Sequence, residues 1–191
     1  MKILFLAPHP FYQERGSPIA NALILKFLSK RGNEVDVVTY AEGTDINYPQ
    51  IRLYRTPNIT CLRNIRPGFS WEKIVSDIFL FFQAIRLIGS KQYDLVHAVK
   101  ESVFIALAVK ALFKIPYVYD MDSSLVEQLI EKYFLLTPFA FILRFFERMA
   151  VKNAKAVMPV CDALAVYIEK YKPKKVVVLS EIGSIVQTMP S

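Results

Sequence analysis

The stretch KILFLAPHPFYQERGSPIANALILKFLSKRGNEVDVVTY, residues 2–40, sets two apolar runs around a helical pattern and decides the fold. The runs 2–7 and 34–40 are mostly apolar, as strands covered on both faces must be. Between them, Pro18 to Arg31 predicts a helix closed by Gly32, with Ser17 as a candidate N-cap and Pro18 at the first helical position. The stretch therefore predicts a strand, a loop, a helix and a second strand.

The same alternation continues along the chain. Further β-rich runs cover 51–56, 94–98, 116–120, 155–160 and 175–179, and helical patterns cover 70–90, 101–113, 138–152 and 162–171. Strands that alternate with helices predict an α/β fold, a Rossmann-like, doubly wound parallel sheet of about seven strands with helices on both faces. We expect one domain over residues 1–180, followed by residues 181–191 as a tail or the start of an interdomain linker.

Three of the predicted helices have expected inward faces. In 70–90, steps of four and three place on one face Ile74, Ile78, Phe81, Ile85 and Ile88. The helix 101–113 carries only Lys110 as an interior charge, so we expect it to be buried on nearly all sides. The helix 138–152 is expected to be capped by Thr137 and to turn inward Phe139, Ile142, Leu143, Phe146 and Met149.

The composition is that of a basic globular chain. Of its 191 residues, 53% are hydrophobic, and the formal net charge is +7. The apolar runs are interrupted before the about 20 residues of a transmembrane helix, and no signal-peptide pattern opens the chain, so we expect a cytoplasmic protein. Cys61 and Cys161 lie far apart without metal-ligand spacing, which argues against a disulfide scaffold or a zinc site. The charge favours anionic partners without choosing among phosphorylated substrates, acidic lipids and nucleic acid.

Titratable residues follow several predicted strands. His9 comes after the first strand, His97 ends the fourth and Asp120 ends the fifth. Ligands of open α/β sheets bind beyond the carboxyl ends of the strands, so these residues are candidates for a site. Ordinary roles as satisfied loop or cap residues are equally open.

The turn Arg15-Gly16-Ser17 is a candidate anion site. It precedes a predicted helix, whose free N–H groups and dipole favour an anion, and Gly16 would let the backbone approach a ligand closely. The turn is neither a dinucleotide fingerprint nor a P-loop, because the further glycines and a GK[ST] sequence are missing. A plain turn glycine therefore stays open.

Further carboxylates lie near the same predicted edge. In YDMDSS, residues 119–124, one of Asp120 and Asp122 could help Ser123 and Ser124 cap the next helix while the other faces the crevice. Glu101 is either an ordinary carboxylate at a helix start or an acceptor of hydrogen bonds from ligand hydroxyls.

Two stretches are suited to a membrane surface. Phe141 and Phe145 lie off the inward stripe, close to Arg144 and Arg148, which suits a membrane interface and equally suits packing against another helix or domain. The run KYKPKK, 170–175, is either a solvated loop or a contact for anionic lipid. Peripheral contact with the inner face of a membrane is thus an expectation beside the cytoplasmic location.

The order of five segments resembles the N-terminal half of GT-B glycosyltransferases, in the large group of retaining enzymes called glycosyltransferase family four. The segments are KILFLAPHP (2–10), ERGSPIANALILKFLSKRGNEVDVVTY (14–40), YDLVHAVKES (93–102), IPYVYDMDSS (115–124) and NAKAVMPVCDALAVYI (153–168). The resemblance implies two Rossmann-like domains facing each other across a cleft. The N-terminal domain would bind mainly the acceptor, and the C-terminal domain the nucleotide-sugar donor.

The resemblance also implies roles for residues. The turn at Arg15, Gly16 and Ser17 would lie near the donor phosphates or the acceptor, and His97 would line the cleft near the transferred sugar. Asp120 is the first choice for the catalytic role of polarising or positioning the sugar and acceptor, with Asp122 second. No metal and no cofactor is implied, because the nucleotide-sugar is a co-substrate.

The family's donor domain would follow residue 180 or so, where this chain soon ends. We therefore expect the chain alone to be inactive, as a truncated enzyme or as one subunit completed by a separate donor-domain chain. The alternative is a noncatalytic Rossmann-like module that binds an anionic sugar or lipid, or a protein partner. Nucleic acid is not an expected partner, because the basic residues are dispersed and no recognised binding motif is present.

Overall fold

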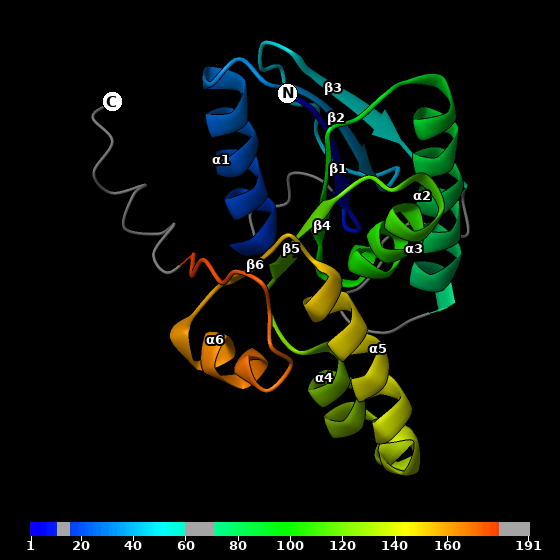
Figure 1. Cartoon of the computed structure of the whole chain (residues 1–191). Coiled ribbons are helices and arrows are strands. Elements are labelled where there is room, and N and C mark those ends of the chain that lie inside the picture. Colours follow the sequence, from blue (N-terminus) through cyan, green and yellow to red (C-terminus); the bar gives the residue numbers. More distant parts are fainter. Residues whose placement is uncertain (11–15, 60–70, 180–191) are drawn as a thin grey trace.

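The computed structural model describes residues 1–10, 16–59 and 71–179, with side chains described except at 16, 17 and 134–136. Its centre is a parallel sheet in the order β3-β2-β1-β4-β5-β6 (Figure 1). The strands are β1 (Lys2–Ala7), β2 (Glu34–Thr39), β3 (Ile51–Arg55), β4 (Leu95–Val99), β5 (Tyr117–Met121) and β6 (Ala156–Pro159). This is the strand order of Rossmann-like folds, so the predicted fold class is confirmed.

Helices cover both faces of the sheet. They are α1 (Gly16–Lys30), α2 (Trp71–Ser90), α3 (Val103–Phe113), α4 (Leu125–Lys132), α5 (Ala140–Asn153) and α6 (Asp162–Glu169), with short 3-10 helices η2 (Lys100–Ser102) and η3 (Phe134–Phe139). Leu25 of α1 packs with Ile3 and Phe5 on one face. The other face, which includes Leu4 and Leu6, packs against residues of α2, α3, α5 and α6.

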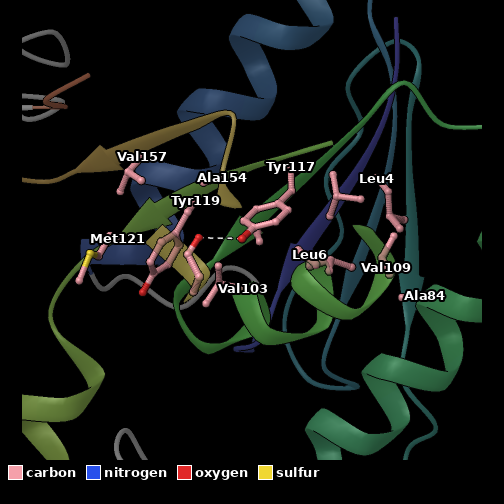
Figure 2. Close-up of a cluster of buried hydrophobic side chains, with 14 of the residues drawn as sticks. Leu4, Leu6, Ala84, Val103, Val109, Tyr117, Tyr119, Met121, Ala154 and Val157 are labelled. Atoms are coloured by element: carbon pink, nitrogen blue, oxygen red, sulfur yellow. Dashed lines mark hydrogen bonds between the residues drawn. The ribbon is translucent and has the colours of Figure 1, made fainter. Parts of the chain in front are cut away.

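Alternation along the strands explains these two cores. Successive side chains of a strand point to opposite faces, so a strand covered on both sides must be apolar throughout. Figure 2 shows the larger core, where Leu4 and Leu6 of β1 and Tyr117, Tyr119 and Met121 of β5 meet α2 and α3. The buried Tyr117 hydroxyl donates a hydrogen bond of 2.7 Å to the carbonyl of Ala150, which ties β5 to α5.

The sheet has six strands rather than the predicted seven. The segment 175–179 does run beside β6, because the Val177 N–H donates to the carbonyl of Val157 and the Leu179 N–H to that of Pro159. Only one parallel bridge forms, between Val157 and Val176. Too few consecutive pairings therefore form for a full strand.

The start of α1 also differs from the prediction. The helix begins at Gly16, so Ser17 lies in its first turn rather than at the N-cap, and Pro18 is its third residue. The position of Pro18 fits a helix start, since proline is tolerated within the first turn. The left-handed Gly32 follows the helix, as predicted, with a φ of 70°.

The inward faces of α2 and α3 were predicted only in part. On α2 the buried side chains are Ser76, Leu80, Ala84, Leu87 and Ile88, whereas Ile78 is exposed. On α3, which starts at Val103 after η2, burial is confined to Val103, Ala106 and Val109. Phe104, Leu112 and Phe113 are exposed, so the expectation of burial on nearly all sides was wrong.

The inward face of α5 was predicted wrongly. Phe139, Ile142 and Phe146 are exposed, and the buried positions are Ala140, Glu147, Ala150 and Val151. Thr137 lies within η3, and the N-cap of α5 is Phe139 without a side-chain hydrogen bond.

The centre of the buried face of α5 is a carboxylate. Glu147, only 2% exposed, accepts hydrogen bonds from the hydroxyls of Ser124 (2.7 Å), Tyr167 (3.1 Å) and Tyr171 (2.9 Å). Because three donors satisfy the carboxylate, its burial is compatible with a stable fold. Ser124 also caps α4, since its hydroxyl accepts from the Glu127 N–H, as the sequence predicted.

Candidate functional site at the carboxyl edge of the sheet

Polar side chains gather where β1, β2, β4 and β5 end. Parallel strands all end at the same edge of the sheet, so residues distant in sequence meet there. The loop after β1 brings His9, the loop after β4 brings Lys100 and Glu101, and Asp122 directly follows β5. The helix α2 adds Lys73 and Asp77 from outside the sheet.

The imidazole of His9 is held in one neutral form. Its Nδ1 lies 3.2 Å from the Pro10 carbonyl, which can only accept, so Nδ1 carries the proton. Its Nε2 lies 2.7 Å from the Asn21 side-chain amide, which donates to it. Burial is the main cause that lowers the pKa of His9 from 6.5 to about 4. The Pro10 hydrogen bond and Asp122 oppose this change, and the Lys100 and Lys73 ammonium groups add to it. At neutral pH this histidine is therefore an uncharged group.

Lys100 has an unusual backbone conformation. Its φ of 53° is in the left-handed region, which costs a non-glycine residue about 1 kcal/mol or more. Lys100 is the first residue of η2, directly after β4, and its ammonium is 3.1 Å from the Asp122 carboxylate. A strained residue in an ion pair at a sheet edge is typical of a ligand-binding position.

A second group of charges lies beside the first. The Lys73 ammonium forms an ion pair with the Glu101 carboxylate, and the Tyr40 hydroxyl donates to the Asp77 carboxylate at 2.5 Å. Burial, followed by repulsion from Glu101, raises the pKa of Asp77 from 3.8 to about 7, although Tyr40 and Lys73 oppose this. Asp77 therefore exchanges a proton near neutral pH.

His97 and Asp120 lie deeper than the sequence suggested. His97 was expected to end β4, but the strand continues two residues further to Val99. Its ring stacks on Phe5 with centroids 4.3 Å apart, and its Nε2 lies 3.5 Å from the Asp120 carboxylate. The two residues are 5% and 4% exposed, and in the part of the chain that the structure describes His97 Nε2 has no hydrogen-bond partner. His97 and Asp120 therefore form a buried pair beneath the carboxyl edge of the sheet.

The structure brings some predicted site residues together and leaves others apart. Glu101 and Asp122 each pair with a lysine at the edge, whereas His97 and Asp120 form the buried pair below it. Arg15 lies outside the described residues, and Gly16 and Ser17 are described only as the start of the α1 backbone.

Four residues of this edge were not predicted, namely Tyr40, Lys73, Asp77 and Lys100. The position of Lys100 directly after a predicted strand was a usable signal. Lys73 and Asp77 belong to α2, and no local sequence pattern predicts where this helix packs on the sheet.

No group of three or more metal-ligating side chains comes together among residues 1–10, 16–59 and 71–179. Within the same ranges, no helix combines the length and the apolar character needed to cross a bilayer.

Comparison with known proteins gives a family and several solved folds. The profile of Glycosyltransferase Family 4 matches residues 20–181. A sucrose-phosphate synthase from Thermosynechococcus elongatus is similar in structure, with a TM-score of 0.65 at 16% identity, over 93% of this chain and 47% of that one. Arabidopsis thaliana UGT89C1 in complex with UDP has a TM-score of 0.57 at 12% identity, over 95% and 49%. No curated protein sequence matches the chain.

These likenesses differ in what they establish. At identities this low, the two solved structures support the fold alone. The chain spans about half the length of each, 47% and 49%.

Proposed function

Since the chain belongs to Glycosyltransferase Family 4, we propose that it is the acceptor-binding half of a retaining glycosyltransferase. The complete enzyme would move a sugar from a nucleotide-sugar to a glycan or a lipid-linked acceptor. The observation that carries the proposal is the family match over most of the chain, joined to a strained, charged edge where ligands of such sheets bind. The UDP complex of UGT89C1, a protein of similar fold, supports a nucleotide-bearing donor.

We assign the cleft-facing carboxylate to Asp122 rather than to Asp120, the first choice from sequence. Asp120 is almost wholly buried within β5, so an acceptor hydroxyl cannot reach it without rearrangement. Asp122 lies just past the strand end, where its carboxylate can accept a hydrogen bond from a sugar hydroxyl. Asp120 would then be a positioning residue that acts through His97, whose Nε2 lies 3.5 Å from its carboxylate beneath the site.

The remaining edge residues would bind and orient the substrates. Lys100 would fix the Asp122 carboxylate from one side, and the uncharged His9 would present a neutral ring with no repulsion toward the nearby lysines. Glu101 would accept hydrogen bonds from acceptor hydroxyls while Lys73 balances its charge. The N-terminus of α1, with Arg15, Gly16 and Ser17, would bind an anionic group such as the donor phosphates.

In this proposal the donor-binding half comes from another segment or chain. Sugar transfer between two domains depends on closing a cleft around the reacting groups, which excludes water and orients fixed dipoles. One half alone offers only one wall of the cleft. We therefore expect no sugar transfer by the 191 residues alone.

The experiment measures nucleotide release from UDP-, GDP- and ADP-sugars, by the chain alone and by the chain joined to a donor-binding half of the same family. Release only in the joined protein is the expected result, and Gly16→Val should weaken it by crowding the anion site. Absence of release in both forms, with sugar or lipid binding retained by the chain, would overturn the proposal. That result would favour the noncatalytic binding module.

A further inference from the structure

A pair of helices projects from the body of the protein. Figure 1 shows α4 and α5 side by side, extending away from the sheet, with the start of α5 at the far end. The two helices contact each other and η3, and α5 also contacts α3. We call residues 125–153 the arm and its far end, Phe139 to Phe146, the tip.

The tip is unusually apolar for a surface. Its exposed side chains are Phe139, Phe141, Ile142, Phe145 and Phe146, and Phe141 alone is 70% exposed. Ala140 and Glu147 are buried instead. Four phenylalanines and an isoleucine exposed within eight residues mark an interaction surface, because single exposed apolar residues are normal but clusters are not.

Basic residues adjoin the tip. Phe141, Phe145, Arg148 and Lys152 follow one another at steps of four, three and four, so aromatic and basic side chains share one stripe of α5. Arg148 and Lys152 also line, with Phe145, Met149 and Asn153, an open groove of about 360 Å³. Lys132 is exposed nearby, and the exposed Arg144 forms an ion pair of 3.4 Å with Glu127 of α4. Between Lys132 and Lys152 the single acid is the buried Glu147.

We propose that the tip inserts into the surface of an anionic lipid bilayer. Aromatic side chains partition into the interface between headgroups and acyl chains, and lysine and arginine bind the anionic headgroups around them. The exposed charge of the stripe is wholly positive, which complements such a surface and opposes pairing with a second copy of a chain of net charge +7. The docking would hold the neighbouring carboxyl edge near a membrane, where a lipid-linked acceptor would be found.

The apolar part of the proposal is tested with vesicles of phosphatidylcholine and phosphatidylglycerol in a flotation assay of the chain. Phe141→Asp with Phe145→Asp should lower partitioning at least about tenfold, because two inserted rings are replaced by charges. The matched control is Phe82→Asp with Leu112→Asp, which changes side chains that are 63% and 68% exposed on α2 and α3. The control should bind like the parent chain.

The charged part is tested with the same vesicles. Arg148→Gln with Lys152→Gln should lower partitioning about thirtyfold, since each basic residue near an anionic surface contributes about 1 kcal/mol. Lys26→Gln with Lys30→Gln on α1 is the charge-matched control and should have less than about a twofold effect. Vesicles of phosphatidylcholine alone should bind the parent chain weakly.

Three results would overturn the proposal. They are no binding of the folded parent chain to anionic vesicles, equal losses in the α5 variants and their controls, and a stable dimer in sedimentation that the Phe141 and Phe145 changes dissociate. Circular dichroism and urea unfolding establish that each variant is folded. Because vesicle binding is measured without turnover, its failure is distinguishable from failure of the proposed glycosyltransferase activity.

Discussion

The two edges of the sheet contain different kinds of buried polar group. At the amino edge, one Asp36 oxygen accepts hydrogen bonds from Lys91 at 2.6 Å and from Tyr93 at 2.7 Å. The Lys91 ammonium also donates a hydrogen bond of 2.7 Å to the Tyr54 hydroxyl. At the carboxyl edge, Asp77 has a pKa raised to about 7 and His97 Nε2 lacks a hydrogen bond within the described chain.

This difference separates stability from function. Groups with short, complementary partners hold strands together, whereas strained backbones and buried polar atoms without a hydrogen bond are features of functional sites. We therefore expect changes at the amino edge to lower the free energy of unfolding. Changes at the carboxyl edge should alter binding, turnover or pH dependence with smaller losses of stability.

The largest expected effect is at the amino edge. Asp36→Ala leaves the Lys91 ammonium and the buried Tyr93 hydroxyl without their shared acceptor, so the free energy of unfolding should fall by about 3 kcal/mol. Urea unfolding measures it. Glu34→Ala, in the same strand, is the control, because its 3.9 Å pair with Lys2 is half-exposed. That change should cost less than about 0.5 kcal/mol, and equal losses would show that the amino-edge network has no special role.

The next effect concerns pH. The raised pKa of Asp77 means that its contribution to stability is present below pH 3.8 and is lost as the pH rises to about 7. The lowered pKa of His9 has the opposite sign, so its contribution is present above pH 6.5 and is lost as the pH falls to about 4. Between these values the two contributions oppose each other.

The variant Asp77→Asn removes the pH-dependent contribution of Asp77 and leaves that of His9. With only the His9 contribution left, the free energy of unfolding should rise from pH 4 to pH 6.5 by at most about 1.4 kcal/mol per pH unit. The parent chain should show a flatter profile in urea unfolding over the same range. Superimposable profiles for the two proteins would show that Asp77 is not perturbed.

The smallest expected effect compares two left-handed lysines. Lys114, with a φ of 62°, ends α3 where glycine is favoured, so Lys114→Gly should stabilise the protein by about 1 kcal/mol. Lys100→Gly relieves similar strain but removes the partner of Asp122, so this variant should gain less stability than Lys114→Gly. It should also reduce turnover in the two-half enzyme, the chain joined to a donor-binding half. Urea unfolding and turnover assays of both variants measure the two effects. Equal turnover would argue that the Lys100 conformation is unrelated to function.

The strands and the fold class could be predicted because burial on both faces leaves a local signature. Runs such as 2–7 and 34–40 are apolar wherever the sheet is covered, and no distant residue is needed to interpret them. The exception is 175–179, which is apolar enough to be a strand but pairs too briefly with β6. Apolar composition indicates the tendency to pair, and the pairing itself depends on the neighbour.

The face of α5 and the depth of the site could not be predicted for a related reason. The prediction assigned aromatic residues to the core and therefore placed Phe139 and Phe146 inside. In the structure Glu147 is buried instead, because it accepts hydrogen bonds from the hydroxyls of Ser124, Tyr167 and Tyr171. Similarly, β4 continues past His97 to Val99, which puts His97 below the edge. Both outcomes depend on contacts between residues far apart in sequence.

The most direct test of the central claim compares Asp122→Asn with Asp36→Asn, for kcat/KM in the two-half enzyme and for urea unfolding. Asp122→Asn should lower kcat/KM at least about tenfold with less than about 1 kcal/mol lost in stability. Asp36→Asn should lower stability and leave kcat/KM of the folded enzyme within about twofold. Full activity in Asp122→Asn, or the larger loss of kcat/KM in Asp36→Asn, would contradict the assignment of function to the carboxyl edge.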